Sequence, residues 1–301
     1  MRARDKKDES MATQISKILS GKPAAELRKK EIEAKKERLA ARSKKPVALS
    51  LATVRVGDSP DTQLYSKSLD RVLEQYGVRH IEKICRTEAE LLREIRPLYA
   101  DKELTGILIF SPIPESINAK NVFLNLPLHK DVEGRTFIKR NPFGVFSPTA
   151  KAVMTLLWYL QKSLDPGYSV KGKHAVMVGH SDLVGKPTAM LLSDEGATVT
   201  VCHKDTQNIQ KYISEADILV VAIGKPGVVQ SSWIKSGAVV IDVGENVVNG
   251  RVVGDIDFES ALKSASYISP VPGGVGPLTN LMVVENLLTL YEFKDALDGN
   301  H

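Results

Sequence analysis

Four segments of the sequence contain residues whose types and spacing could do chemistry. The first is GHSDLVGKP, residues 179–187, which lies between an expected strand and an expected helix. Glycines there would let the backbone approach a pyrophosphate, and the helix N-terminus would add N–H donors and a positive dipole end. The segment does not follow the G-x-G-x-x-G pattern, so a plain strand-to-helix turn explains it equally well.

The second segment is PGGVGP, residues 272–277, which precedes the last expected helix. Its three glycines and two prolines specify an unusual backbone path. This composition is typical of a loop that wraps closely around a flat ligand, and the alternative is a tight turn without a ligand.

The other two segments indicate little on their own. Tyr65 stands alone on an expected helix, where a tyrosine more often packs than forms a ligand platform. Asp131 and Glu133 form an acidic pair in the loop KDVEG, and such a pair is usually solvated or caps a helix. Neither segment predicts a site without the others.

Strands and helices must position these segments, and the two alternate along both halves of the chain. Apolar runs bounded by Gly or Pro predict buried strands, and Gly, Pro and capping residues mark the expected helix ends. In the first half we expect strands at 47–56, 80–85 and 105–110, and helices at 12–43 (with a break at Gly21-Lys22-Pro23 as the alternative), 61–76, 88–99 and 118–126. In the second half we expect helices at 150–163, from about 186, at 209–216 and at 279–293, and strands at 174–179, 197–203, 217–224 and 238–244.

This alternation predicts an α/β protein with parallel sheets covered on both faces. The order of elements in the second half is that of a Rossmann-type dinucleotide-binding domain. The Gly- and Pro-rich stretch 131–149 indicates a crossing between domains or a binding loop. We therefore expect two α/β domains with a cleft between them, the first made of residues 1–150 plus 279–301 and the second of residues 151–278.

Composition limits the classes of function. The chain has 301 residues, 43% hydrophobic and 26% charged, with a formal net charge of +5 that could steer an anionic small molecule toward a cleft. It has no apolar run near the ~18 residues of a membrane span, and its first residues lack the apolar region of a secretory signal. Two cysteines make neither a disulfide framework nor a metal site, so we expect a cytoplasmic protein without a metal.

Basic residues cluster in the first expected helix, but glutamates are interleaved with them. This pattern favours an ordinary solvated helix face over a nucleic-acid-binding patch. No nucleic-acid-binding motif follows the helix. We expect neither nucleic acid nor membrane as a partner.

Taken together, the segments resemble the methylenetetrahydrofolate dehydrogenase/cyclohydrolase family over residues 13–293. The resemblance is carried in order by TVRVGDSPDTQLY, TGILI and KDVEG, then by GHSDLVGKP, VTVCH, DILVVAIGKPG, VVIDVG, GDIDF and PVPGGVGPLT. It implies a folate substrate, NADP or NAD as cofactor, and a homodimer.

The resemblance also assigns roles to single residues. Tyr65 matches the tyrosine that lies against the folate, and Glu133 matches an aspartate that binds the pterin. The family's lysine, one helical turn after the tyrosine, is Leu69 here, and the glutamine thought to hold that lysine is Phe110. Lys67 is a poor substitute, because two residues rotate a helix by ~200° away from Tyr65.

The remaining expected site residues also follow from the resemblance. For the substrate they are Tyr65, Pro112, Asp131, Glu133, Pro272, Gly273 and Gly276. For the cofactor they are Thr149, Gly179, His180, Ser181, Val184, Gly185, Pro187, His203, Lys204, Gly224 and Glu245.

The preference between NAD and NADP stays open. His180 replaces the family's arginine near the 2′-phosphate, while Lys204 could pair with a phosphate and Asp205 could accept from a ribose hydroxyl. Glu245 replaces a residue that is usually apolar beside the nicotinamide, and it either attracts the oxidised ring or faces water.

These replacements predict unequal effects on the two family reactions. Hydride transfer from the methylene carbon needs positioning rather than a protein acid or base. Hydrolysis of the methenyl product needs proton transfer, and loss of a positioned acid–base group costs ~10²–10⁴-fold. We therefore expect an NAD(P)-dependent methylenetetrahydrofolate dehydrogenase with weak or absent cyclohydrolase activity.

Three alternatives remain. The first is full bifunctional activity, with another group in place of the lysine. The second is a catalytically degenerate paralogue that binds folate, cofactor or a partner. The third is a related dehydrogenase acting on a modified carrier, because Phe110 and Glu133 alter the substrate site.

Overall fold

The computed structural model describes residues 17–57, 59–135 and 144–297. Two compact α/β units are present, which confirms the expected fold class. We call Arg28–Pro148 with Asn280–His301 the three-stranded unit, and Met1–Leu27 with Thr149–Thr279 the five-stranded unit, after their sheets.

The three-stranded unit is a parallel sheet in the order β2-β1-β3. The strands are β1 (Ser50–Val56), β2 (Arg79–Cys85) and β3 (Gly106–Ile109). Its helical segments are α3 (Pro60–Gln75), α4 (Glu88–Ala100), α5 (Ala119–Leu124) and the 3₁₀ turn η1 (Leu128–Lys130). The unit also contains most of α2 (Gly21–Ser43) and α10 (Gly276–Leu297).

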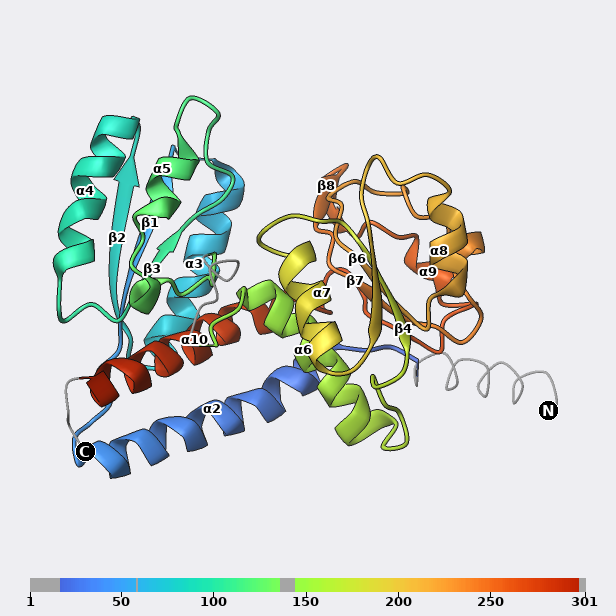
Figure 1. The fold of residues 1–301 in the computed structure, drawn as a ribbon, viewed down its shortest axis with the longest axis horizontal. Helices are drawn as coiled ribbons and strands as arrows, with labels where there is room; N and C mark the ends of the chain where they lie inside the picture. Colours follow the sequence, from blue (N-terminus) through green and yellow to red (C-terminus); the bar gives the residue numbers. More distant parts are fainter. Residues whose placement is uncertain (1–16, 58, 136–143, 298–301) are drawn as a thin grey trace. The chain divides into compact units, whose positions relative to one another are not determined.

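Both faces of β1 are buried, as its apolar and β-branched sequence predicts. On one face, Ala52 and Val54 pack with Leu91 and Ile95 of α4 and with residues of β3 and α5 in one core cluster (Figure 1). On the other face, polar side chains pair between β1 and β2 and between β2 and α3. His80 of β2 contacts Thr53 at 2.7 Å, and Ser66 of α3 donates to Glu82 at 2.9 Å.

Helix starts in this unit follow the local sequence. The Ser59 hydroxyl accepts a hydrogen bond from the Thr62 amide, and a proline occupies the first turn of α3. The Thr87 hydroxyl accepts from the Glu90 amide at the start of α4, whose first turn is acidic as the helix dipole favours. The three strands of this unit end within one residue of where the sequence predicts.

The five-stranded unit is a parallel sheet in the order β10-β7-β6-β4-β5. The strands are β4 (His174–Val178), β5 (Thr198–Cys202), β6 (Ile218–Val221), β7 (Val239–Asp242) and β10 (Tyr267–Ile268). The helical segments are α6 (Pro148–Tyr159), a π-turn (Leu160–Leu164), α7 (Gly185–Asp194), α8 (Ile209–Glu215), η4 (Ser231–Trp233) and α9 (Phe258–Ala261). Residues of α8, η4 and α9 pack with β4, β6 and β7 in one core cluster.

A β-hairpin formed by β8 (Asn246–Val248) and β9 (Arg251–Val253) was not expected. Its two turn residues, Asn249 and Gly250, both have positive φ. Asn-Gly between two short apolar runs is a strong signal for such a turn, and it is present in the sequence as VVNGRVV.

The start of the chain differs from its expected place. The helix expected at 12–43 begins only at Gly21, consistent with the break considered there, and residues 12–16 lie outside the described part. The Leu19 amide donates to Ile268, the Ile268 amide donates to Lys17, and the Gly21 amide donates to Gly273. Residues 17–27 therefore belong to the five-stranded unit, whereas the sequence-based boundary assigned them to the first domain, because these backbone pairs are long-range contacts that leave no local sequence pattern.

No helix within residues 17–57, 59–135 and 144–297 is long and apolar enough to cross a membrane. Cys85 and Cys202 are both buried free thiols.

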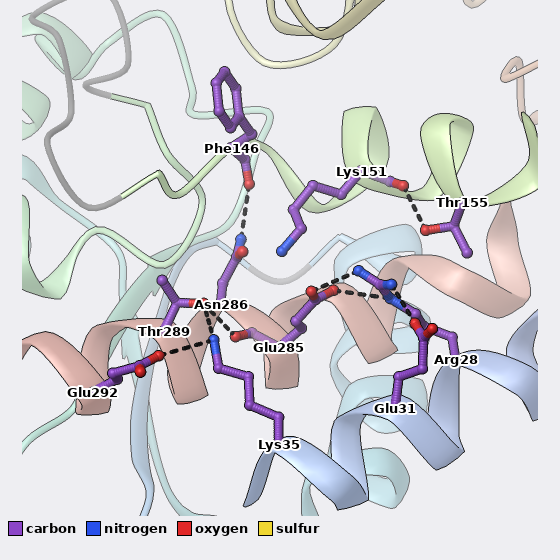
Figure 2. Close-up of polar contacts among 10 residues, drawn as sticks. All are labelled: Arg28, Glu31, Lys35, Phe146, Lys151, Thr155, Glu285, Asn286, Thr289 and Glu292. Atoms are coloured by element: carbon purple, nitrogen blue, oxygen red, sulfur yellow. Dashed lines mark hydrogen bonds and ion pairs between the residues drawn. The ribbon is translucent and has the colours of Figure 1, made fainter. Parts of the chain in front are cut away.

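In the three-stranded unit, polar contacts join α2 and α10 (Figure 2). Arg28 donates through Nε and Nη2 to the two carboxylate oxygens of Glu285, at 3.3 and 2.6 Å. About two turns further along α2, Lys35 donates to Thr289 at 3.0 Å. The bidentate Arg28–Glu285 pair is the better shielded, because the Glu285 side chain is 16% exposed against 37% for Glu292, which pairs with Lys35 and Arg42.

We expect Glu285→Ala to lower the free energy of unfolding by about 1–2 kcal/mol, because it leaves a half-buried guanidinium without its bidentate partner. Glu292→Ala is the matched control on the same helix and should cost about 0.5 kcal/mol or less. Urea unfolding of both variants measures the difference. Equal losses would contradict the assignment of Glu285 as the main polar contact between these helices.

Candidate functional site

In the three-stranded unit, Tyr65 and Phe110 meet although they are far apart in sequence. Their rings contact edge to face, with centroids 5.4 Å apart and an interplanar angle of 84°. Leu69, one turn after Tyr65 on α3, is fully buried, whereas Lys67 is exposed. The position where the family resemblance expects a lysine is therefore apolar and closed to water, and Lys67 lies on the outer face of the helix.

The segment that carries Glu133 is held beside β3. Asp131 forms a parallel bridge with Ile107 of β3. The buried Asn286 of α10 donates to the Phe146 carbonyl oxygen at 2.8 Å (Figure 2). It also donates to the Val132 carbonyl oxygen at 2.8 Å. Gly134 has a φ of 62°, and a Cβ there would meet the Val145 carbonyl oxygen at 2.5 Å. Helix α10 thus fixes both sides of the loop that presents Glu133.

Glu133 is paired with Arg135. Arg135 Nε donates to Glu133 Oε2 at 2.7 Å, and Nη2 donates to the Ile109 carbonyl at 2.9 Å and to Ser111 Oγ at 2.8 Å. The guanidinium also lies over the Phe123 ring, 4.3 Å from its centroid. The sequence alone does not single out Arg135. The signal that could find it is a basic residue two positions after Glu133, in a chain that lacks the lysine expected at position 69.

Burial raises the pKa of the Glu133 carboxyl above its ordinary value, and the charge and hydrogen bond of Arg135 oppose that rise. Burial, and secondarily the charge of Glu133, raises the pKa of Tyr65, so its phenol stays protonated near neutral pH. Tyr65, Phe110, Glu133 and Arg135 therefore form one cluster at the end of β3.

Lys130 does not supply a proton to this cluster. Its side chain is buried and its ammonium donates to the carbonyl oxygens of Leu98, at 2.9 Å, and Asp101. These carbonyls lie at the end of α4, where a cation complements the helix dipole. Lys130 thus stabilises the helix end.

The other expected substrate residues of this unit are Asp131, which is buried, and Pro112, which follows a cis peptide bond and is exposed.

In the five-stranded unit, the loop after β4 has the close backbone packing expected of a dinucleotide cradle. Gly179 has a φ of 123°, and a Cβ there would meet the Ala222 carbonyl oxygen at 2.3 Å. A Cβ on Gly185 would meet the Gly179 carbonyl oxygen at 2.1 Å. Ser181 Oγ accepts from the amides of Val184 and Gly185, and α7 starts there with Pro187 buried in its first turn.

Two expected cofactor residues meet at the carboxyl ends of β4 and β5. The rings of His180 and His203 lie 4.9 Å apart between centroids. The His203 amide donates to Thr206 Oγ1 at 2.8 Å, and His203 Nδ1 accepts from the Asp205 amide at 3.3 Å. Lys204 is exposed beside them. In doubly wound sheets this edge receives the nucleotide.

Two buried aspartates brace the next loops. Asp255 Oδ2 accepts from the amides of Ile223 and Gly224 at 2.6 and 2.9 Å, and Oδ1 accepts from Asn246 Nδ2 at 2.9 Å. Asp242 accepts from the Asp255 and Ile256 amides, and burial raises its pKa to about 6. No local pattern in the sequence selects either aspartate, although Asp242 stands in the segment VVIDVG and Asp255 in the segment GDIDF.

The remaining expected residues occupy three further places in this unit. Pro272 follows a cis peptide bond, Gly273 has a φ of 107°, and Gly276 begins α10. A Cβ on Gly21 would meet the Gly274 carbonyl oxygen at 1.9 Å, so the N-terminal segment packs directly on this loop. Thr149 lies half-buried in the first turn of α6, and Glu245 is exposed.

The two units contain no group of three or more His, Cys, Asp or Glu side chains that could hold a metal ion, among the residues that the structure describes.

Known families and proteins match both units. Residues 19–133 match the family described as tetrahydrofolate dehydrogenase/cyclohydrolase, catalytic domain, and residues 147–295 match tetrahydrofolate dehydrogenase/cyclohydrolase, NAD(P)-binding domain. The bifunctional protein FolD of Dictyoglomus turgidum is 39% identical over 279 residues, which cover 90% of this chain and 96% of the relative.

Two solved structures are similar over nearly the whole chain. The Trypanosoma brucei N5,N10-methylenetetrahydrofolate dehydrogenase-cyclohydrolase, complexed with NADP and an inhibitor, is 33% identical with a TM-score of 0.80, covering 92% of this chain and 97% of that one. A 5,10-methylenetetrahydrofolate dehydrogenase from the silkworm Bombyx mori is 31% identical with a TM-score of 0.82, covering 93% and 99%.

We expect Asp255→Ala to weaken dinucleotide binding about tenfold or more, because it leaves two loop amides without their acceptor. Asp257→Ala is the matched control, since Asp257 is an exposed cap of α9 two residues away. Titration calorimetry with NADP⁺ and NAD⁺ measures both. Unchanged affinity in Asp255→Ala would show that the loop does not depend on this brace.

Proposed function

The chain belongs to the tetrahydrofolate dehydrogenase/cyclohydrolase family, and from this premise we propose that it oxidises 5,10-methylenetetrahydrofolate with NAD(P)⁺ while its hydrolysis of the methenyl product is weak or absent. The proposal of weak hydrolysis rests on Leu69 and Phe110. Leu69 is fully buried, and Phe110 packs against Tyr65.

In the dehydrogenase reaction a hydride leaves the methylene carbon, and the lone pair of a folate nitrogen forms the new C=N bond of the methenyl cation. The bound nicotinamide supplies the hydride acceptor. The chain's own part is to bind and orient. The Gly179–Gly185 loop and the Asp255 brace would hold the dinucleotide, and Tyr65 and Glu133 would hold the pterin end.

Hydrolysis needs a group that gives and takes protons. Leu69 and Phe110 cannot do so, and arginine, the residue type at position 135, does not serve as a proton-exchanging group in proteins. Lys130 is engaged at the end of α4. Tyr65 stays protonated, because burial and Glu133 raise its pKa. These losses support a dehydrogenase that releases its methenyl product.

A second candidate is the full bifunctional activity. The close relatives named above include bifunctional proteins. In this chain one observation favours it: Glu133 is buried and burial raises the pKa of its carboxyl, and a carboxyl perturbed in this way is a candidate proton donor or acceptor. A homodimer remains a prediction from the family resemblance, and a cytoplasmic location remains a prediction from the cysteine content.

The test is a spectroscopic assay of the purified chain with 5,10-methylenetetrahydrofolate and either NAD⁺ or NADP⁺, in which reduced nicotinamide and methenyl product are followed separately. We expect cofactor reduction, with the methenyl product decaying within about threefold of its uncatalysed rate, given the size of the missing acid–base contribution. Rapid methenyl decay would establish the bifunctional candidate. No reduction with either cofactor would reject both.

We also expect Leu69→Lys alone to add no hydrolysis and to lower stability, because it places a charge at a fully buried position. Leu69→Lys with Phe110→Gln should raise the hydrolysis rate about tenfold or more, since the amide can hold the ammonium. Phe110→Gln alone is the control. Full hydrolysis in the single Leu69→Lys variant would contradict this account of the site.

A further inference from the structure

The guanidinium of Arg135 is fixed within the substrate cluster, yet the proposed reaction does not use it. Its side chain is 13% exposed and is held on three sides, by Glu133, by the end of β3 and by the Phe123 ring. A long side chain loses rotamer freedom when it is held in this way. Its position beside Glu133 is therefore a defined feature of the site.

The contacts of Arg135 leave part of the guanidinium available. Nε uses its hydrogen on Glu133, and Nη2 uses two on Ile109 and Ser111. An arginine has five N–H donors, so the two on Nη1 remain. They make no hydrogen bond to any residue in the described ranges 17–57, 59–135 and 144–297. Glu133 keeps acceptor capacity as well, because a carboxylate accepts at about four positions.

The edge of a pterin ring presents three groups in a row: the 2-amino donor, the N3–H donor and the O4 acceptor. A carboxylate alone, as in the family's aspartate, matches the two adjacent donors. A carboxylate beside a guanidinium presents an acceptor next to a donor. That pair matches N3–H and O4, with both hydrogen bonds charge-assisted.

We propose that Arg135 determines substrate specificity by donating to O4 of the pterin while Glu133 accepts from N3–H. This inference rests on the proposed function, because it concerns the same folate site. It predicts that the chain discriminates 4-oxo pterins from 4-amino pterins, in which a donor replaces the O4 acceptor. The same guanidinium is also a positioning residue for Glu133.

The ionisation of Glu133 gives a second, independent signature. Burial raises the pKa of Glu133, and Arg135 opposes that rise. Removing the guanidinium raises this pKa further. Because the carboxylate must be ionised to accept from N3–H, binding of a 4-oxo pterin would then be lost at a higher pH than in the unmodified protein.

The experiment measures binding of folic acid and of its 4-amino analogue aminopterin to the full chain, by titration calorimetry near neutral pH. We expect Arg135→Met to lower the preference for folic acid over aminopterin by about tenfold or more, the value of one charge-assisted hydrogen bond. A pH series with folic acid should show the midpoint of binding loss shifted upward. Arg71→Gln is the control, because Arg71 is an exposed arginine of α3 in the same unit.

Arg135→Lys separates donation to the pterin O4 from the effect of the positive charge on Glu133. It also keeps the test valid if Arg135→Met fails to fold. Lysine keeps the charge beside Glu133 but lacks the planar donor edge. We expect it to keep the pH midpoint near that of the unmodified protein and still to lose most of the preference for folic acid. Preferences within twofold of the unmodified protein in both variants would overturn the role of Arg135 and leave the proposed function intact. If the unmodified chain binds neither pterin, both proposals fail.

Discussion

Carboxylates buried at the carboxyl ends of parallel strands are the constraint on which both candidate sites depend. Such a group must be matched by donors, because an unpaired buried charge is costly. In the five-stranded unit the donors for Asp242 and Asp255 are mainly backbone amides. In the three-stranded unit the main donor for Glu133 is the side chain of Arg135. The first arrangement is built into the backbone path, whereas the second depends on one side chain.

Because of this difference, the two units differ in how strongly side-chain substitutions can change their sites. The loops after β6 and β7 are tied together by amides that every residue carries, so their shape is insensitive to most side-chain changes. The cluster at the end of β3 can change its chemistry through single residues. Where the family resemblance expects a lysine and a glutamine, Leu69 and Phe110 offer neither an ammonium nor an amide, and Arg135 places a guanidinium beside Glu133. Hydride transfer requires orientation, and hydrolysis requires proton exchange, so the same replacements bear differently on the two reactions.

Much of the fold follows from local sequence. The seven strands expected from the sequence were predictable to within three residues, because apolar β-branched runs such as VVID and ILVV are bounded by Gly, Pro and polar residues. The start of α2 and the hairpin of β8 and β9 differ for separate physical reasons. The segment before Gly21 is held by backbone pairing with residues some 250 positions later, at Ile268 and Gly273. The hairpin follows from the two-residue turn Asn249-Gly250, which is a local signal in the sequence.

The sequence by itself determined the fold class and the family, and it predicts that Leu69 stands where the family resemblance expects a lysine. These follow from local periodicity and from ordered motifs, which act over short stretches of chain. Only the tertiary structure decided that Arg135 pairs with Glu133, that Lys130 turns to the end of α4, and that Asp255 braces the loop at Gly224. Each of these contacts joins side chains to backbone groups of distant strands or helices, or depends on which residues are buried. The direction in which a loop side chain turns is set by the donors and acceptors that folding places around it, and no local pattern records them.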